Sequence, residues 1–381
     1  MTEVFISAEN IITSLGFSIQ HNADNMLAEM TGIRLKEDNS IAPAPFYASV
    51  VDTALLAEKF AVIDDPVQYT RFEQLAICSL HDALSRSDVD PADPGTLFIL
   101  STTKGSIDLL EKEKENKFGQ DRIHLWNAAR LIQRFFTFRN EPLVISNACI
   151  SGVQAILTGA RLISAGLSDN VVINGTDIVS EFVLAGFNSF QSLSNGPCRP
   201  FDKSRDGLSL GEGSGTVVLS KTPFNSNRAG NIVVGEGFSS NDANHISGPS
   251  RTGEGLFIAI NRLLKKSPVE VDYISAHGTG TPYNDEMESI AITRAGLQSV
   301  PVNSFKGYWG HTLGAAGIIE TVMCLYSMHT GVLFGTKGYN EPGITHPINI
   351  TGHSMKKDIK NCLKIASGFG GCNVALLLHK I

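Results

Sequence analysis

Cysteine is scarce in this sequence of 381 residues, and the few cysteines are scattered. The six lie at positions 78, 149, 198, 324, 362 and 372, with no CxxC pair and none of the density that cross-links small secreted domains. This spacing argues against a disulfide scaffold and fits a reducing compartment. We therefore expect a cytoplasmic protein.

Long apolar runs and an excess of basic residues are also missing. No run approaches the roughly 20 residues that span a bilayer, and the first twenty residues carry Glu3 and Glu9 in place of a basic leader followed by an apolar segment. The formal net charge of −7 argues against nucleic acid as a default partner. We expect neither a membrane nor a nucleic-acid partner.

Two ligand-binding patterns are incomplete. The glycine-rich stretch 207–215 lacks the lysine and Ser/Thr that close a GxxxxGKS phosphate loop, so we interpret it as backbone turns in a packed fold. Two histidines in glycine-rich settings, His277 and His311, lie on no helix face at metal-ligand spacing. A metal site would need extra assumptions, and we expect none.

The sequence does contain a regular alternation of strand-like and helix-like segments, which predicts an α/β fold with buried sheets. The predicted strands are 4–6, 96–100, 170–174, 216–219, 232–235, 271–276 and 300–303. The predicted helices are 22–30, 67–84, 255–264, 285–295 and one that follows His311. The charge-rich run 108–122, with Lys112, Lys114 and Lys117, predicts a solvated helix or loop.

The polar run 222–230 is the best boundary between two halves of the chain. The length allows one large or two ordinary domains, and we predict an N-terminal half at 1–222 and a C-terminal half at 223–381. A strand, a polar turn and a glycine- and alanine-rich helix recur in both halves. This recurrence suggests a diverged duplication, although no residue-level repeat proves it.

The stretch 144–152 holds the strongest candidate nucleophile, Cys149. Apolar residues run into the cysteine, and an apolar helical pattern begins at Val153, which indicates a strand that turns sharply into a helix. The helix dipole would favour a thiolate and could lower the cysteine pKa from roughly 8.5 to about 3.5–7.5. From this stretch alone, Cys149 could equally be a small buried hydrophobic residue.

His277, His311 and Lys306 suit covalent catalysis by such a cysteine. Imidazole N–H groups can donate to an oxyanion in the transition state, each worth about 2.7–4 kcal/mol. Lys306 stands five residues before His311, close enough to bring positive charge to the same site. Each histidine alone is more often a structural residue, and the combination favours catalysis.

Five motifs follow one another in order along the chain, at 147–152, 199–213, 276–281, 306–317 and 368–373. Together they resemble the β-ketoacyl-acyl-carrier-protein synthases of the elongating Cys-His-His class, in the thiolase-like superfamily. The resemblance implies a thiolase-like fold, with two pseudo-duplicated βαβ halves in a layered α-β-α-β-α arrangement. The first half would carry the nucleophile and the second the histidines.

The resemblance also implies a reaction. Cys149 would take an acyl group from a carrier thioester, and His277 and His311 would hold the malonyl thioester carbonyl during decarboxylation. The resulting carbanion would attack the Cys149 thioester in a Claisen condensation. The backbone N–H groups of Cys149 and Phe369 would form the acyl oxyanion hole, and Phe369 would act as the gate between the acyl pocket and the malonyl site.

Further roles carry over from the same motifs. Lys306 would orient or charge the histidine end of the site, with Glu320 as its partner, and Thr279 and Thr281 would hydrogen-bond the phosphopantetheine arm of the substrate. No free cofactor is implied, because the substrates are carried on an acyl carrier protein. A homodimer is expected, with a heterodimer with a related subunit as the alternative.

The segment 123–136 allows two interpretations. Its apolar residues, including Trp126, recur at near-helical spacing, which is typical of ordinary core packing. In the family that the motifs resemble, the corresponding segment reaches across the dimer to cap the partner's acyl pocket. Trp126 would then be the tunnel floor.

Several departures from the family pattern bear on the substrate. Cys372 stands where threonine is common, and Gly280 where a small polar residue is common. The loop 193–198 is short and lacks a basic residue, and 64–71 is more acidic than the usual entrance, so the details of carrier docking differ. A dedicated carrier of a secondary-metabolite pathway is as credible as the general fatty-acid carrier.

Other functions fit less well. A catalytically silent chain-length subunit would lack the nucleophile, a starter-unit synthase would carry asparagine in place of His311, and a thiolase would carry a second cysteine in place of Phe369. A papain-like thiol hydrolase would explain neither the second histidine motif nor Lys306. The silent chain-length subunit is kept as the alternative function.

Overall fold

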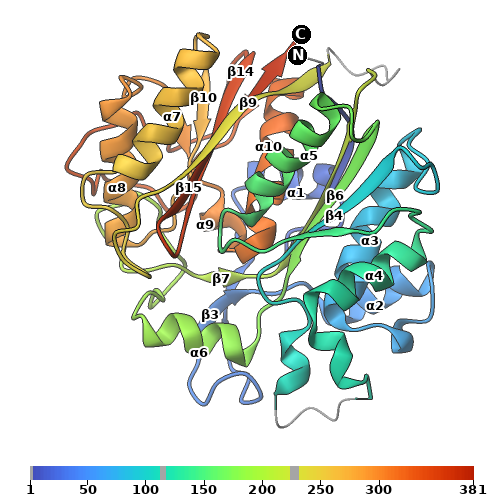
Figure 1. Ribbon diagram of the computed structural model, residues 1–381. Coiled ribbons are helices and arrows are strands. Elements are labelled where there is room, and N and C mark those ends of the chain that lie inside the picture. The colour runs from blue at the N-terminus through green and yellow to red at the C-terminus, as the bar shows by residue number, and fades with distance from the viewer. Residues whose placement is uncertain (1–2, 112–116, 224–230) are drawn as a thin grey trace.

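A computed structural model describes residues 3–111, 117–223 and 231–381 (Figure 1). Within these residues ten strands form one sheet, to which each half of the chain contributes five neighbouring strands. From the centre outward, the first half supplies β1 (Phe5–Ile12), β8 (Gly213–Ser220), β6 (Asn170–Asp177), β4 (Thr96–Ser101) and β5 (Leu143–Ile145). The second half supplies β9 (Ile232–Asn241), β15 (Cys372–Lys380), β14 (Asn361–Gly368), β10 (Tyr273–Ser275) and β11 (Val302–Asn303).

The two half-sheets repeat one topology. In the first, β1 and β8 pair antiparallel, as do β8 and β6, and the β6–β4 and β4–β5 pairs are parallel. The second follows the same order, with β9–β15 and β15–β14 antiparallel and β14–β10 and β10–β11 parallel. The halves meet where Phe5 pairs with Val233. The expected thiolase-like duplication is confirmed.

The helices form three layers around the two half-sheets (Figure 1). The central layer holds α5 (Ser151–Ser164) and α10 (Ala316–Thr330), and each of these helices contacts strands of both half-sheets. The outer faces are covered by α2 (Thr53–Ala61), α3 (Arg71–Ser85) and α4 (Leu125–Phe135) on the first half, and by α7 (Glu254–Lys266) and α8 (Pro282–Arg294) on the second. This is the α-β-α-β-α arrangement that the motifs predicted.

The central helices cross with almost no space between their backbones. A Cβ atom on Gly152 would stand 2.7 Å from the Ile318 nitrogen, and one on Gly317 would stand 2.4 Å from the Val153 nitrogen. Glycine is therefore required at both positions, because no side-chain carbon fits into so close a backbone contact. The crossing places the start of α5, just after Cys149, beside the start of α10, just after His311.

The structure confirms the predicted elements and shifts several of their ends. The helix predicted at 22–30 is α1 (Ile19–Leu27), which starts early because the Ser18 side chain caps it. The helix predicted at 67–84 is split into η1 (Pro66–Gln68) and α3, because Thr70 and Glu73 form a capping box. The strand predicted at 4–6 continues through three buried polar residues, Ser7, Glu9 and Asn10, to Ile12.

Other segments differ more. Part of the glycine-rich stretch 207–215 is strand, in β7 (Leu210–Gly211) and the start of β8. The run 108–122 overlaps η2 (Ile107–Leu110) and η3 (Gln120–Ile123), and its residues 112–116, with Lys112 and Lys114, lie outside the described residues. So do residues 224–230 of the predicted boundary.

Sequence patterns missed several elements. These are α2, β2 (Ile33–Lys36), β3 (Phe46–Ser49), α6 (Glu181–Ser189), α9 (Lys306–Trp309), β12 (Val332–Leu333), β13 (Met355–Lys356), β14, β15 and η4 (Leu313–Ala315). Strands β2, β3 and β7 form a small second sheet, and β12 pairs with β13. None of the described helices combines the length and apolar character needed to cross a membrane.

Candidate active site

Cys149 lies in a strained turn between β5 and α5. Ala148 adopts a φ of +45°, in the left-handed region that non-glycine residues rarely enter. The Ser151 hydroxyl stabilises the turn, because it accepts from the Asn147 N–H at 2.7 Å and donates to the Ala148 carbonyl at 2.6 Å. The turn therefore holds the thiol at a fixed position two residues before the first residue of α5.

The predicted lowering of the Cys149 pKa is wrong. The residue is 7% exposed, and burial raises the thiol pKa to about 11, although the Lys306 charge and the Phe369 N–H both favour the thiolate. Desolvation of the charged form outweighs these stabilising groups and the helix N-terminus. The Cys149 side chain is therefore a neutral thiol at neutral pH.

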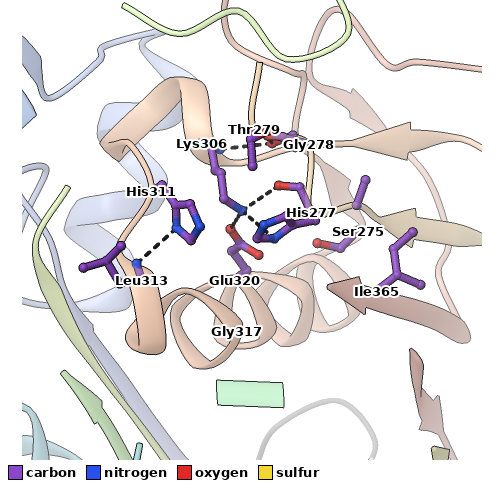
Figure 2. Close-up of polar contacts among 12 residues, drawn as sticks. Ser275, His277, Gly278, Thr279, Lys306, His311, Leu313, Gly317, Glu320 and Ile365 are labelled. Carbon is purple, nitrogen blue, oxygen red and sulfur yellow. Dashed lines mark hydrogen bonds and ion pairs between the residues drawn. The ribbon is translucent and has the colours of Figure 1, made fainter. Parts of the chain in front are cut away.

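The two predicted histidines meet Cys149 in space. His277 follows β10 and His311 follows α9, and the thiol sulfur and one ring nitrogen from each histidine lie within 4.8 Å of one another. The histidine rings are 5.0 Å apart at an angle of 82° (Figure 2). Three segments far apart in the sequence thus form one cluster.

Hydrogen bonds fix which ring nitrogen carries the proton in each histidine. His311 Nδ1 accepts from the Leu313 N–H at 3.1 Å, and His277 Nδ1 lies 3.3 Å from the Lys306 ammonium, which has only protons to offer (Figure 2). Each ring therefore carries its proton on Nε2. The buried His311 Nε2 has no hydrogen-bond partner among the described residues.

Both imidazoles are neutral. Burial, followed by the charge of Lys306, holds the pKa of His277 and of His311 well below the usual value. A neutral imidazole with its proton on Nε2 can donate a hydrogen bond without losing the proton. The pair therefore offers two donors suited to one developing negative charge.

Lys306 contacts His277, although it is closer to His311 in the sequence. Its ammonium donates to the His277 carbonyl at 2.5 Å and to Glu320 Oε1 at 2.6 Å, and both ion-pair partners are buried (Figure 2). The predicted Lys306–Glu320 pair is present. It joins the start of α9 to α10 and fixes the loop that carries His277.

Two carboxylates that sequence reasoning missed hold the same loop. Glu288 accepts from the N–H groups of His277 and Gly278, each at 2.7 Å, and Asp285 accepts from Thr279 at 3.0 Å. Both acids lie on α8 and are fully buried. Burial, and then the neighbouring Asp285, raises the pKa of Glu288 to about 7. Their position directly after the motif 276–281 was the available signal.

Phe369 lies against Cys149, and its role as a gate stays a prediction. Its backbone N–H points at the Cys149 thiol, and a Cβ atom on Gly368 would stand 3.1 Å from the Cys149 nitrogen. The Phe369 ring packs 5.5 Å from that of Phe187 and 5.3 Å from that of Phe190. These two rings come from α6 and its C-terminal cap, an element that sequence patterns did not predict.

A cavity of about 320 Å³ opens onto the cluster. Thr279 and Thr281 line it together with Cys149 and both histidines, and the two threonine hydroxyls are 2.8 Å apart. Trp126 does not line this cavity and is 53% exposed on α4, although Ala129 and Ile132 on the same helix are buried. The Trp126 side chain is therefore not part of the core of this chain. Its role in a partner's pocket stays a prediction.

The cluster of one thiol and two imidazoles could also hold a metal ion such as Zn²⁺. Sequence spacing gave no sign of this donor set, because the three side chains come from three separate elements. Metal binding requires an Nε2 lone pair, whereas the bond from the Leu313 N–H leaves the proton of His311 on Nε2. The observed hydrogen bonds fit a donor role better.

Comparisons with known proteins identify the family. Residues 2–224 match the family model of the β-ketoacyl synthase N-terminal domain, and residues 231–340 match that of the C-terminal domain. The chain belongs to the β-ketoacyl synthase family. The position of the predicted boundary between the halves stays a prediction.

Similar proteins cover most or all of the chain. A mitochondrial 3-oxoacyl-[acyl-carrier-protein] synthase of Schizosaccharomyces pombe is 32% identical over 426 aligned positions, covering 100% of this chain and 99% of its own. The ketoacyl synthase alpha subunit of the tetracenomycin polyketide synthase of Streptomyces glaucescens is 30% identical and covers 82% of each chain. The synthase described here is thus a condensing acyltransferase.

Solved structures of ketosynthases share the fold of this chain. A chain of the complex between the ketosynthase ApeO and its chain length factor ApeC, from Xenorhabdus doucetiae, matches with a TM-score of 0.86 and 27% identity, covering 100% of this chain and 98% of that one. A β-ketoacyl synthase from Burkholderia phymatum shares the fold, with a TM-score of 0.86 at 22% identity and full coverage of both chains. The silent-subunit alternative is not favoured, because this synthase keeps Cys149 and both histidines in one cluster.

Proposed function

We propose that this synthase catalyses decarboxylative Claisen condensation of an acyl group on Cys149 with a malonyl group on an acyl carrier protein. The meeting of one thiol with two neutral imidazole donors carries the proposal. In the first half-reaction the Cys149 sulfur bonds to the acyl carbonyl carbon and the bond from that carbon to the carrier sulfur breaks. The thiol proton leaves with the carrier, so the buried site gains no net charge.

In the second half-reaction the malonyl thioester oxygen accepts hydrogen bonds from Nε2–H of His277 and of His311. The bond to the carboxylate carbon breaks, CO₂ leaves, and its electron pair forms an enolate that the two donors stabilise, each by about 2.7–4 kcal/mol. The enolate carbon then bonds to the acyl carbonyl carbon on Cys149. The Cys149 and Phe369 N–H groups stabilise that oxyanion, and Cys149 leaves as thiolate and takes a proton from solvent.

Thr279 and Thr281 would hydrogen-bond the phosphopantetheine arm, because their hydroxyls line the cavity that leads to Cys149. We expect no free cofactor, since the carrier supplies this arm. Similar solved structures include a type II polyketide acyl-carrier protein in complex with its ketosynthase. The named relatives serve fatty-acid and polyketide synthesis alike, so the product class is a β-ketoacyl carrier in one of these pathways.

We propose a homodimer built on the edge of the sheet. β5 is an outer strand of the ten, its residue Leu143 is exposed, and the exposed Trp126 of α4 lies near it. The cluster of Cys149, His277 and His311 comes from one chain, so a second copy of this chain can serve as the partner; the similar ketosynthase ApeO forms a complex with its chain length factor. Six free cysteines fit the predicted cytoplasmic location.

Separation of the half-reactions tests the proposal. In His277→Ala and His311→Ala, acyl uptake at Cys149 should survive, while malonyl decarboxylation should fall by about a hundredfold or more, the loss typical of an oxyanion donor. His353→Ala, which removes a histidine that is 91% exposed, is the control. Intact mass and CO₂ release measure the two steps. Equal loss of both steps would instead make a histidine the general base for the thiol.

A further inference from the structure

A second buried lysine, Lys364, lies behind the cluster and belongs to none of the motifs. It is on β14, where it pairs with Ser275 of β10, two residues before His277. Its side chain is 0% exposed. Burial of an ammonium is costly unless oxygen atoms surround it, so its surroundings should be specific.

The Lys364 ammonium lies in a cage of four oxygen atoms. It donates to Glu320 Oε2 at 2.7 Å and to the Ile365 carbonyl at 3.0 Å, and the carbonyls of Ser275 and Ala276 each lie 3.4 Å away. Figure 2 places Ser275 and Ile365 on the side of Glu320 away from His311. The cage thus joins α10, β14 and the backbone that leads into His277.

The single negative charge of Glu320 is shared between two lysines. Glu320 binds Lys306 through Oε1 and Lys364 through Oε2, so one carboxylate serves two ammonium groups. Lys306 in turn donates to the His277 carbonyl and faces its ring. If Glu320 lost its second partner, it could rotate toward Lys306 and draw that ammonium away from His277.

We propose that Lys364 is a positioning residue of the active site, whose ammonium holds Glu320 and the segment before His277 so that the His277 Nε2–H faces the malonyl carbonyl. Lys364 touches no substrate in this scheme and acts through Glu320 and the backbone. The inference rests on the proposed function for its kinetic consequence. Its effect on the His277 ring does not depend on that function.

Three variants separate a positioning role from a purely structural one. Lys364→Ala empties the cage and leaves room for a small cation, whereas Lys364→Met fills the same space without charge. Lys380→Ala is the matched control, since this lysine lies on the adjacent strand β15 and its ammonium binds the Met328 carbonyl. Circular dichroism and thermal melting establish that each variant is folded.

Kinetics give the first measurement. Acyl uptake at Cys149 should stay near the wild-type rate in all three variants, while malonyl decarboxylation should fall about tenfold to a hundredfold in the two Lys364 variants, mainly in kcat. Ammonium chloride should restore most of the loss in Lys364→Ala. It should restore nothing in Lys364→Met, and sodium chloride at equal ionic strength should not replace it.

A substrate-free measurement keeps the proposal separate from the proposed reaction. In protein labelled with ¹⁵N-histidine, the Lys364→Ala spectrum should show His277 in mixed tautomers, and ammonium should restore the wild-type signal. If the wild-type protein catalysed no condensation but Lys364→Ala still showed this spectral change, the proposed reaction would be refuted and the positioning role of Lys364 would stand.

Three results would overturn the proposal, and two of them come from the His277 signal and from Lys364→Met. One is an unchanged His277 signal in both Lys364 variants. The other is normal decarboxylation in folded Lys364→Met, and this variant decides the matter if Lys364→Ala does not fold. A loss of decarboxylation in Lys364→Ala that ammonium does not restore would also count against it.

Discussion

At the scale of single residues, the proposed nucleophile Cys149 is strongly buried. Burial raises the pKa of Cys149 to about 11, so the thiol is neutral at pH 7. The transfer we propose needs no stable thiolate, because the thiol proton leaves with the carrier. For this transfer, the position of the Cys149 thiol in a strained turn beside the Phe369 N–H matters more than the charge of the thiol.

The pH dependence of alkylation tests this interpretation. A pKa raised to about 11 means that the thiolate fraction keeps growing across the neutral range. Alkylation of Cys149 by iodoacetamide should therefore increase about tenfold per pH unit from about pH 6.5 to 9. Mass spectrometry of the peptide containing Cys149 measures the rate. A plateau near pH 7 would show instead that the pKa is depressed.

Acylation should be specific to the same residue. Incubation with acyl-carrier should add mass to the peptide that contains Cys149, and Cys149→Ala should abolish transfer and remain folded. Cys198 and Cys372 are informative internal controls, because Cys198 is buried near Lys306 and Cys372 ends the glycine loop. Modification mainly at either of them would refute the assignment.

At the scale of elements, the crossing of α5 and α10 positions the site. Gly317→Ala should destabilise the fold by about 1–3 kcal/mol, because the new methyl group would meet the Val153 backbone nitrogen at 2.4 Å. Gly186→Ala is the matched control on α6, where a new Cβ atom meets nothing within 4 Å. Helix propensity should make that variant neutral or up to about 1 kcal/mol more stable. Urea unfolding measures both, and equal stability of the two variants would contradict the argument.

The aromatic cluster beside α6 is the second test at this scale. Phe190→Ala removes the edge-to-face partner of Phe369, a contact worth about 0.5–1.5 kcal/mol. If Phe369 is the gate, the open state should gain about two- to tenfold in population, and Cys149 alkylation should accelerate by that factor. Phe182→Ala, which removes an exposed ring elsewhere on α6, should change nothing. An unchanged rate in Phe190→Ala would mean that its ring does not hold the gate.

At the scale of the whole molecule, the free edge of β5 predicts a dimer with a shared pocket. Trp126→Ala should lengthen the longest acyl chain accepted and leave short-chain transfer largely intact. Because the ring is 53% exposed in one chain, its removal should cost the monomer far less than the about 3–5 kcal/mol typical of a core tryptophan. Chain-length profiles and sedimentation measure the two parts. An unchanged profile would reject the pocket role, and a monomer at working concentration would reject the shared pocket.

The sequence by itself determined the candidate reacting groups and the order of the elements that carry them. Cys149 and His277 stand in turns after predicted strands, and Lys306 and His311 follow the predicted strand 300–303; this local pattern is readable because turn geometry depends on neighbouring residues. The alternation of strands and helices likewise predicted the layers, since hydrophobic periodicity is a local property. The strand β15 was missed because its continuous apolar run 374–378 lacks such a period, and β14 was missed because Lys364 interrupts its short apolar segment.

Tertiary structure alone decided how these groups behave. The pKa of Cys149 rose where the helix dipole predicted a fall, because desolvation depends on everything packed around the thiol. Lys306 turned toward His277, and Glu320 acquired Lys364 as a second partner 44 residues away along the chain. Burial and long-range contacts set the charge and orientation of each group, and neither can be derived from the residues adjacent in sequence.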